Sequence, residues 1–212
     1  MKRHADYCPI ARTLDVVGDR WTLLVLRELL FGDRRFSDLR RNIPGISPTL
    51  LTERIQVLAE QGLVATRELP PPAARTVYTA TPRSRDIVPI LQAMARFGMD
   101  LLPPARESTK IRPATAAHGA VTAWYDADAA SGLDEVYRLA IDGEEFTLTS
   151  GRGGRRRAQD REPDLVLTAP AHVILAARKH ETTLGEAIAR GAVKVEGSKR
   201  ALRNFQAVFR LP

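Results

Sequence analysis

Four polar side chains of one amphipathic segment are placed to form hydrogen bonds with a partner: Ser47, Thr49, Thr52 and Gln56. The apolar residues of the segment recur at helical spacing and would share another face, namely Leu51, Ile55 and Leu58. Ser47 can cap the helix, Pro48 suits its first position, and Gly62 predicts its end. Hydroxyl and amide groups contact base edges or phosphates in nucleic-acid complexes, whereas an ordinary surface helix would carry the same pattern.

Five arginines in or near this segment are candidates to bind phosphate: Arg34, Arg35, Arg54, Arg67 and Arg75. Residues 1–112 hold 18 basic and 12 acidic residues, a net charge of +6, whereas residues 113–212 hold 14 and 13, a net charge of +1. Positive charge concentrated in one half is typical of a region that binds a polyanion. A generally arginine-rich composition is the alternative interpretation.

Catalytic arrangements have little support in the sequence. His172 and His180 have no cysteine beside them, and no paired carboxylates or glycine-rich phosphate loop are placed for chemistry. We therefore predict a protein that is not an enzyme and needs no metal or cofactor. The first residues lack the apolar stretch of a secretory signal, and no apolar run approaches the roughly 20 residues of a membrane span. A cytoplasmic protein is expected.

Cys8 is the single cysteine, which excludes an intrachain disulfide. It is predicted near the start of a helix, beside Lys2, Arg3 and Arg12, where positive charge favours the thiolate. Cys8 is therefore a candidate redox or electrophile sensor. An intersubunit disulfide between two copies of Cys8 is a further alternative. The alternative is a small packing residue at the edge of a domain.

The elements around the Ser47 helix predict a helix-turn-helix followed by a wing. Helices are expected from Cys8 to Gly18, from Asp19 to Gly32 and over residues 34–41, with a turn at residues 42–46. Two short strands, residues 63–67 and 76–80, flank a tip that contains Pro70, Pro71 and Pro72. A last helix starts at Thr81 with Pro89 as its kink and presents a long apolar stripe: Ile87, Ile90, Leu91, Met94, Phe97 and Leu101.

This half resembles the HxlR family of winged helix-turn-helix transcriptional regulators over roughly residues 5–102. The resemblance is carried by linked blocks in order, namely residues 8–10, 18–22, 26–29, 35–39, 43–47, 50–55 and 60–63. It implies a DNA-binding homodimer that acts as a local repressor or activator, and some relatives use a cysteine at the place of Cys8 as a sensor. The expected partner is palindromic double-stranded DNA, whose symmetry matches a two-fold protein dimer. This favours the apolar stripe of the last helix as the dimerisation surface.

A second domain is expected after a proline-containing linker. Asp142–Gly143 is a strong hairpin signal between two β-prone runs, and it pairs Ile141 with Glu144. That register also pairs Leu139 with Phe146 and Tyr137 with Leu148. Later strands and helices are expected at residues 164–168, 170–177, 183–191, 193–196 and 198–209. The prediction is an α+β domain with an antiparallel-rich sheet covered by helices.

The strand at residues 164–168, the helix at 184–191 and the strand at 193–197 resemble the sterol carrier protein (SCP-like) domain. This resemblance implies a cavity for lipids or other hydrophobic molecules. Four side chains are candidates for the cavity wall, although plain core is the alternative: Tyr137, Leu139, Phe146 and Leu148. The loop at Arg152–Arg157 is a candidate to bind an anion such as phosphate or carboxylate, and the alternative is a solvated loop with no ligand.

The expected organisation is a winged-helix domain at residues 1–104, a linker at 105–117 and an SCP-like domain at 118–212. The predicted function is a homodimeric DNA-binding regulator, in the first instance a repressor, whose DNA affinity responds to a hydrophobic effector. Two other functions are kept: a thiol-based regulator acting through Cys8, and a lipid carrier whose basic half docks on acidic surfaces.

Overall fold

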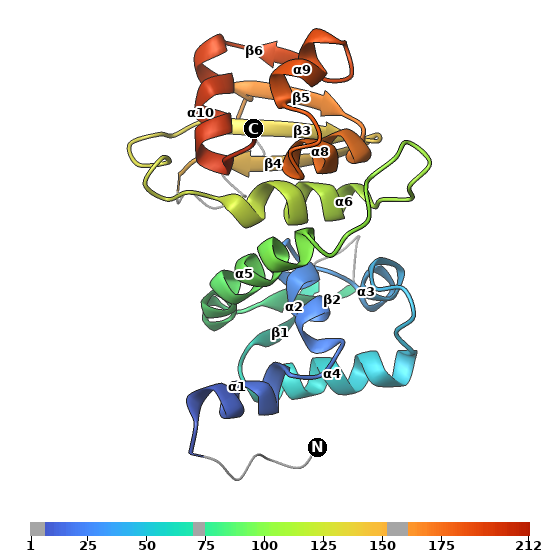
Figure 1. Ribbon diagram of the computed structural model, residues 1–212. Coiled ribbons are helices and arrows are strands. Elements are labelled where there is room, and N and C mark those ends of the chain that lie inside the picture. Colours follow the sequence, from blue (N-terminus) through green and yellow to red (C-terminus); the bar gives the residue numbers. More distant parts are fainter. Residues whose placement is uncertain (1–6, 70–74, 152–160) are drawn as a thin grey trace. The chain divides into compact units, whose positions relative to one another are not determined.

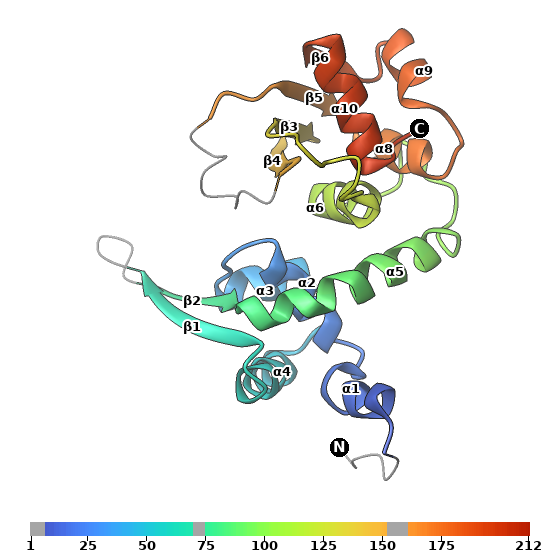
Figure 2. The same cartoon turned by 90° about the vertical axis from the view of Figure 1, so that its left-hand side faces the viewer.

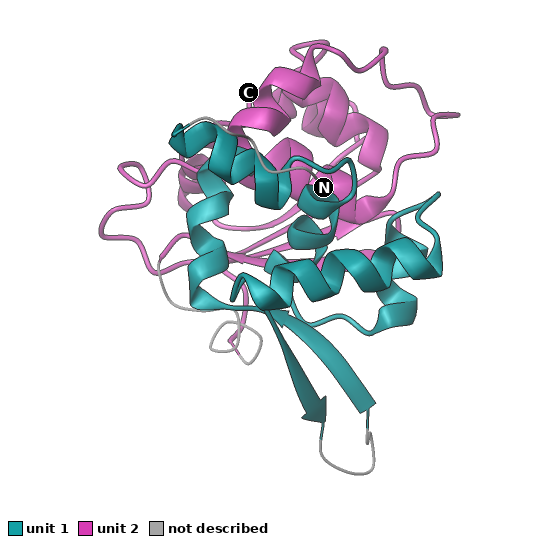
Figure 3. Ribbon diagram, turned by 90° about the horizontal axis from the view of Figure 1, so that it is seen from below, with its two compact units in different colours: residues 1–91 teal, residues 92–212 magenta. Residues whose placement is uncertain are grey.

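The structure, a computed structural model, describes residues 7–69, 75–151 and 161–212. The prolines expected at the wing tip, the arginine-rich loop and the two basic residues before Cys8 lie outside these ranges. The chain divides into two units, residues 1–91 and residues 92–212, which are coloured in Figure 3. The domain limits expected from the sequence stay a prediction.

The first unit has the helix-turn-helix order predicted from the sequence. In chain order its elements are α1 (Pro9–Val17), α2 (Thr22–Leu30), α3 (Phe36–Asn42), α4 (Pro48–Glu60), β1 (Val64–Leu69), β2 (Arg75–Ala80) and the 3-10 helix η1 (Pro82–Ile87) (Figure 1). β1 and β2 form an antiparallel wing with Val64 opposite Ala80. Buried aliphatic residues of α2, α3 and α4 form one core. The winged helix-turn-helix fold is thus present.

Two local expectations for this unit were wrong. Arg34 was expected in the third helix but forms a β-bridge with Tyr78, and α3 begins only at Phe36. Pro89 was expected to kink a helix that starts at Thr81. The chain instead forms η1 and then a separate helix, α5 (Val88–Met99), whose second residue is Pro89. A proline in the first helical turn breaks no backbone hydrogen bond, so no kink is needed.

The second unit contains a four-stranded sheet with helices on one of its faces. Its elements are α6 (Pro113–Thr115), η2 (Ala116–Val121), η3 (Thr122–Trp124), β3 (Val136–Ile141), β4 (Glu144–Thr149), β5 (Leu165–Ala169), α8 (Ala171–Arg178), α9 (Leu184–Ala189), β6 (Lys194–Gly197) and α10 (Lys199–Phe209). The strand order is β4-β3-β5-β6. Figure 2 shows α6, α8, α9 and α10 on the same side of the sheet. The α+β class is confirmed.

The hairpin register matches the prediction from Asp142–Gly143. Ile141 is opposite Glu144, Leu139 opposite Phe146, and Tyr137 opposite Leu148. Both turn residues have positive φ, 45° at Asp142 and 84° at Gly143, as a type I′ hairpin turn requires. β5 then pairs with β6 antiparallel, while β3 and β5 pair in parallel, so the sheet is mostly antiparallel.

One helical segment was missed by the sequence analysis. Residues 113–117, expected to be linker, begin a continuous helical stretch formed by α6, the π-helical turn η2 and η3. Pro113 stands at the first helical position, and the alanines that follow favour helix, but the stretch offers little contrast between apolar and polar faces. Ala116, Ala117, Ala120 and Val121 are buried against the sheet core.

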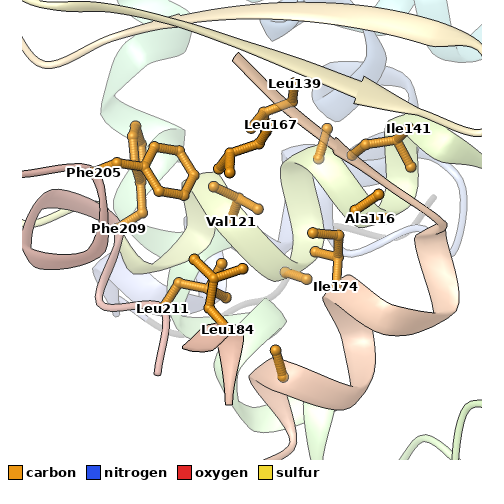
Figure 4. Close-up of a cluster of buried hydrophobic side chains, with 14 of the residues drawn as sticks. Ala116, Val121, Leu139, Ile141, Leu167, Ile174, Leu184, Phe205, Phe209 and Leu211 are labelled. Atoms are coloured by element: carbon orange, nitrogen blue, oxygen red, sulfur yellow. The ribbon is translucent and has the colours of Figure 1, made fainter. Parts of the chain in front are cut away.

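The core of the second unit lies between the sheet and its helices. Figure 4 shows side chains of β3, β5, η2, α8 and α10 meeting there, with Leu139, Leu167, Val121, Ile174 and Phe205 labelled among them. Buried Arg178 donates three hydrogen bonds, to the carbonyl oxygens of Ala120, Phe209 and Arg210, at 2.6 to 2.8 Å. Its guanidinium stacks on Trp124 at 4.2 Å. One cation therefore joins the ends of two helical segments.

Candidate nucleic-acid interface

Helix α4 is fixed at both ends by the residues that the sequence indicates. The Ser47 hydroxyl accepts a hydrogen bond from the backbone N–H of Leu50 at 3.2 Å. After the helix, Gly62 has a φ of 67°, a conformation that suits glycine. The inward stripe of Leu51, Ile55 and Leu58 is buried in the core of the first unit. The opposite face of α4 is therefore held outward by the packing of this stripe.

The polar side chains predicted to read DNA lie on the exposed surface of α4. Thr49, Thr52 and Gln56 are all exposed, and so is Ser47 at the N-cap. The Thr52 hydroxyl donates to the carbonyl oxygen of Pro48 at 3.1 Å, and the Gln56 amide donates to Glu60 at 3.1 Å. Such contacts with the same helix are short-range and can be exchanged for contacts with a partner. The arrangement presents hydroxyl and amide groups along one side of α4.

The turn before α4 packs against the core of the first unit through buried apolar residues. Ile43 and Ile46 are buried, and Gly45 between them has a φ of 90°. A side chain at Gly45 would meet the ring of Trp21 at 3.4 Å in addition to the strain of its backbone. The tight turn between α3 and α4 therefore has a defined shape, which sets the direction in which α4 leaves α3.

Arg54 and Arg67, both predicted to bind phosphate, are paired with carboxylates of the same unit. Arg54 on α4 lies 3.7 Å from Asp19 and 3.4 Å from Glu53. Arg67 on the wing forms an ion pair with Asp33, which precedes α3. These pairs connect α4 and the wing to loops that are distant in sequence. The acidic partners were missed because 34 residues separate Asp33 from Arg67, and no local pattern predicts such a contact.

The other three predicted arginines differ in exposure. Arg35 and Arg75 are exposed, at the start of α3 and on the wing strand β2. Arg34 is half-buried. Its backbone exchanges two hydrogen bonds with Tyr78, at 3.0 and 2.8 Å, and its Nε lies 3.9 Å from Glu28. Arg34 thus extends the wing to a third backbone segment. Of these three, only Arg35 and Arg75 are exposed to solvent.

Helix α5 divides the predicted dimerisation residues into two groups. Ile90, Met94, Phe97 and Leu101 are exposed by 40%, 51%, 74% and 71%, respectively. Ile90, Met94 and Phe97 recur at helical spacing and form one apolar stripe on α5, and Leu101 lies in the turn that follows the helix. Ile87 and Leu91 are partly buried, and Ile87 packs against the core of the first unit. The sequence analysis also missed two exposed apolar residues on α1, Ile10 and Leu14.

Cys8 occupies the N-cap position of α1 and is partly exposed. Its backbone carbonyl accepts the first helical hydrogen bond, from Arg12 N–H at 3.0 Å. The backbone position agrees with the expected helix start. The sensor role stays a prediction.

The predicted ligand-wall residues are part of the second unit's packed core. Tyr137, Leu139 and Leu148 are buried and Phe146 is partly buried. The Tyr137 hydroxyl donates to the Glu135 carboxylate at 2.9 Å, and its ring packs edge-on against Phe205, with centroids 5.3 Å apart. Burial, followed by the bond to Glu135, raises the pKa of Tyr137. A ligand there would have to displace packed side chains.

Across the described residues, no helix is long and apolar enough to cross a membrane. The same residues contain no group of three or more His, Cys, Asp or Glu side chains arranged to hold a metal ion.

Comparison with known proteins decides the family of the first unit. The model of the HxlR-like helix-turn-helix family matches residues 16–106. A helix-turn-helix transcriptional regulator of Synechocystis is 39% identical over 95 residues, which are 45% of this chain and 70% of that protein. The chain belongs to the HxlR-like helix-turn-helix family. It is thus a transcriptional regulator of the HxlR type, and its residues 118–210 match the SCP-2 sterol transfer family.

Other similarities cover about half of this HxlR-like chain. A helix-turn-helix regulator of Mycobacterium bovis is 38% identical over 104 residues, 49% of this chain and 65% of that protein. Among solved structures, the reduced transcriptional regulator YodB of Bacillus subtilis is 26% identical, with a TM-score of 0.40, covering 48% of this chain and all of YodB. The oxidised redox regulator HypR is 29% identical, with a TM-score of 0.42, covering 44% of this chain and 96% of HypR.

Proposed function

We propose that this HxlR-like protein binds a palindromic DNA operator as a homodimer and represses transcription, and that a hydrophobic small molecule in its second unit modulates DNA affinity. The observation that carries the DNA-binding part is the geometry of α4. Its apolar stripe is buried while Thr49, Thr52 and Gln56 are exposed along one side. A helix of this kind inserts into the major groove and contacts base edges through its outward side chains.

Phosphate contacts would surround that helix. Arg35 and Arg75 are exposed and carry the charge needed to neutralise phosphates on either side of the groove. Arg54, Arg67 and Arg34 are held by carboxylates, so they are kept in defined positions near the same surface. Threonine and glutamine discriminate bases weakly compared with a bidentate arginine. DNA shape and phosphate contacts are therefore proposed to contribute much of the specificity.

The homodimer is supported by the apolar stripe of α5. Three large apolar side chains along one face of α5, with Leu101 in the turn that follows, are unusual on the surface of a monomer, and a two-fold partner would bury them. A second copy is the partner of choice because a palindromic operator needs two recognition helices related by a two-fold axis. Bound across a promoter, such a dimer would exclude RNA polymerase, which is the reason for proposing repression.

Regulation by an effector is supported by the SCP-2 match and by the course of α5. The chain passes from the first unit into the second within this helix. In the second unit, Met99 joins the apolar core, the Arg96 guanidinium donates to the carbonyl oxygen of Ala123 at 3.0 Å, and the Gln92 amide donates to that of Thr122 at 3.3 Å. A ligand that repacks this core would act on the helix that carries the proposed dimer surface.

In vitro selection from random DNA tests the proposal. The full chain should enrich a palindrome with half-sites about one helical turn apart, near 10 base pairs. The selection is then repeated with a panel of fatty acids and sterols, with thermal unfolding as an independent measure of binding. Recovery of no common sequence would contradict the DNA-binding proposal. A compound that raises the unfolding temperature and leaves DNA affinity unchanged would contradict the effector proposal alone.

A further inference from the structure

A buried carboxylate on α2 contacts the end of α3 and the segment that bridges to the wing. Glu28 on α2 is only 1% exposed. Its Oε1 accepts a hydrogen bond from Arg27 Nη2 at 2.8 Å, its Oε2 accepts one from Asn42 Nδ2 at 3.1 Å, and Arg34 Nε lies 3.9 Å from the same Oε2. Removing a carboxylate from water is costly unless charged and hydrogen-bonding partners compensate. Glu28 therefore joins α2, α3 and the segment that bridges to the wing.

The contact with Asn42 lies at a sensitive point of the fold. Asn42 is the last residue of α3, and the four residues after it form the turn that leads to the Ser47 cap of α4. Ile43 and Ile46 of that turn are buried, and their backbone N–H groups donate to the carbonyl oxygens of Leu39 at 2.9 Å and Ile43 at 3.3 Å. The bond between Glu28 and Asn42 adds a directional constraint, because a charged hydrogen bond has a preferred geometry.

The contact with Arg34 acts on the wing. The backbone of Arg34 is already bonded to Tyr78 of β2, and the nearby Glu28 carboxylate limits where its guanidinium can point. The same negative charge partly neutralises Arg27 and Arg34. Glu28 thereby restrains both the recognition helix and the wing, and it lowers the positive charge that would attract any DNA.

We infer that Glu28 is a positioning residue for DNA recognition, which holds the turn before α4 through Asn42 and the base of the wing through Arg34. The inference rests on the proposed DNA-binding function. A buried ion pair is poor evidence for added stability, since well-packed apolar residues of the same volume often serve as well. Its directional contacts fit a role in fixing the angle of α4 and so the preference for the operator over random DNA.

The first test needs no DNA. Hydrogen exchange is measured on the full-length Glu28→Gln and Asn42→Ala variants. Both should exchange the backbone amides of the non-proline residues within 43–51 at least about threefold faster than the wild type, because a bond to a charged group is lost. Amides of the second unit should be unchanged. The control is Asp86→Asn, which removes one negative charge from an exposed position of η1. Wild-type exchange in Asn42→Ala would overturn the inference, even if Glu28→Gln fails to fold.

The second test compares the selected operator with random DNA. The ratio of the two affinities should fall about tenfold in Glu28→Gln, while random-DNA affinity is kept or raised because two arginines lose a neutralising charge. A merely structural defect would weaken both kinds of binding together. An unchanged ratio would overturn the inference. If the wild type itself shows no preference for any DNA, the proposed function fails, and the exchange experiment still decides the role of Glu28 in the turn.

Discussion

At the scale of single residues, the arginines of the winged-helix unit fall into two groups with different energetics. Arg35 and Arg75 are exposed, so a phosphate can bind them without breaking an existing ion pair described in the structure. Arg54 and Arg67 are paired with Asp19 and Asp33, and a phosphate must compete with those carboxylates. Ion pairs near the surface contribute about 1 kcal/mol or less, so the competition is feasible but lowers the gain.

Arg75→Ala should weaken binding to the operator and to random DNA by the same factor. A phosphate contact carries no sequence information, and its loss removes about one released counterion, so the slope of log affinity against log salt should flatten by about 0.9. Titrations at several salt concentrations measure this slope. Arg200→Ala, an exposed arginine on α10, is the matched control and should keep the wild-type slope. A loss confined to the operator would assign Arg75 to base recognition instead.

Thr49→Ala combined with Gln56→Ala, unlike Arg75→Ala, should weaken binding to the operator and leave binding to random DNA unchanged. Both side chains are exposed on α4, and neither carries charge, so random-DNA affinity and the salt slope should stay as in the wild type. Operator affinity should fall about tenfold, the loss expected for one or two hydrogen bonds to bases. Competition titrations with operator and random duplexes give both values. Equal affinity of the variant and the wild type for the operator would remove these residues from the recognition surface.

At the scale of elements, local signals predicted more than long-range ones. The caps Ser47 and Gly62 located α4, and Asp142–Gly143 gave the register of the β3–β4 hairpin, because in each case neighbouring residues determine the backbone. The parallel pairing of β3 with β5 was not predicted, because the intervening chain carries no signal for it. The α6–η3 segment was missed because its small apolar residues show no periodic contrast.

In the candidate site too, local patterns were predicted and contacts between distant residues were not. The outward residues of α4 followed from helical periodicity, and the structure exposes them as expected. The carboxylates Asp19, Asp33 and Glu28, which hold the arginines, were not predicted because their partners lie on other elements. A sequence pattern indicates which side chains share a face, but pairing across a tertiary contact depends on how the faces pack.

The capping box of α9 makes stability depend on pH in the acid range. Thr183 N–H donates to the Glu186 carboxylate at 2.9 Å, and this bond is the main cause that lowers the pKa of Glu186 below its ordinary 4.5. As the pH falls, the unfolded chain binds the proton first, so the stabilisation is full above pH 4.5 and is lost as the pH drops through the lowered pKa. Glu186→Gln should remove this part of the acid destabilisation.

Thermal unfolding of the full chain at pH 6 and pH 3, which span the ordinary pKa of 4.5, measures this difference. The interval between the two unfolding temperatures should be smaller in Glu186→Gln than in the wild type. Glu196→Gln, an exposed carboxylate on β6, serves as the control and should keep the wild-type interval. An identical interval in all three proteins would mean that the capping box does not contribute to the acid response.

At the scale of the whole molecule, the segment around α5 has packed residues near its two ends and exposed apolar residues between them. Ile87, just before its first turn, packs against the core of the first unit, and Met99, at its end, is buried in the core of the second. Ile90, Met94 and Phe97, which lie between them in the sequence, stay exposed. Each of these two contacts lies within its own unit, and a helix with one packed side keeps its outward face defined, which is what a specific dimer contact requires.

Phe97→Glu combined with Leu101→Glu should convert the proposed homodimer into a monomer. The two side chains are 74% and 71% exposed, so the monomer fold should tolerate the change, whereas two-fold symmetry would bring four new carboxylates together. Sedimentation equilibrium should show half the wild-type mass, and operator affinity should fall at least about a hundredfold because each half-site then binds alone. Ala207→Glu, an apolar-to-acidic change at an exposed position of α10, should remain dimeric. A double variant that stays dimeric with full operator affinity would place the dimer contact elsewhere, and the exposed residues of α1 would then be the next surface to test.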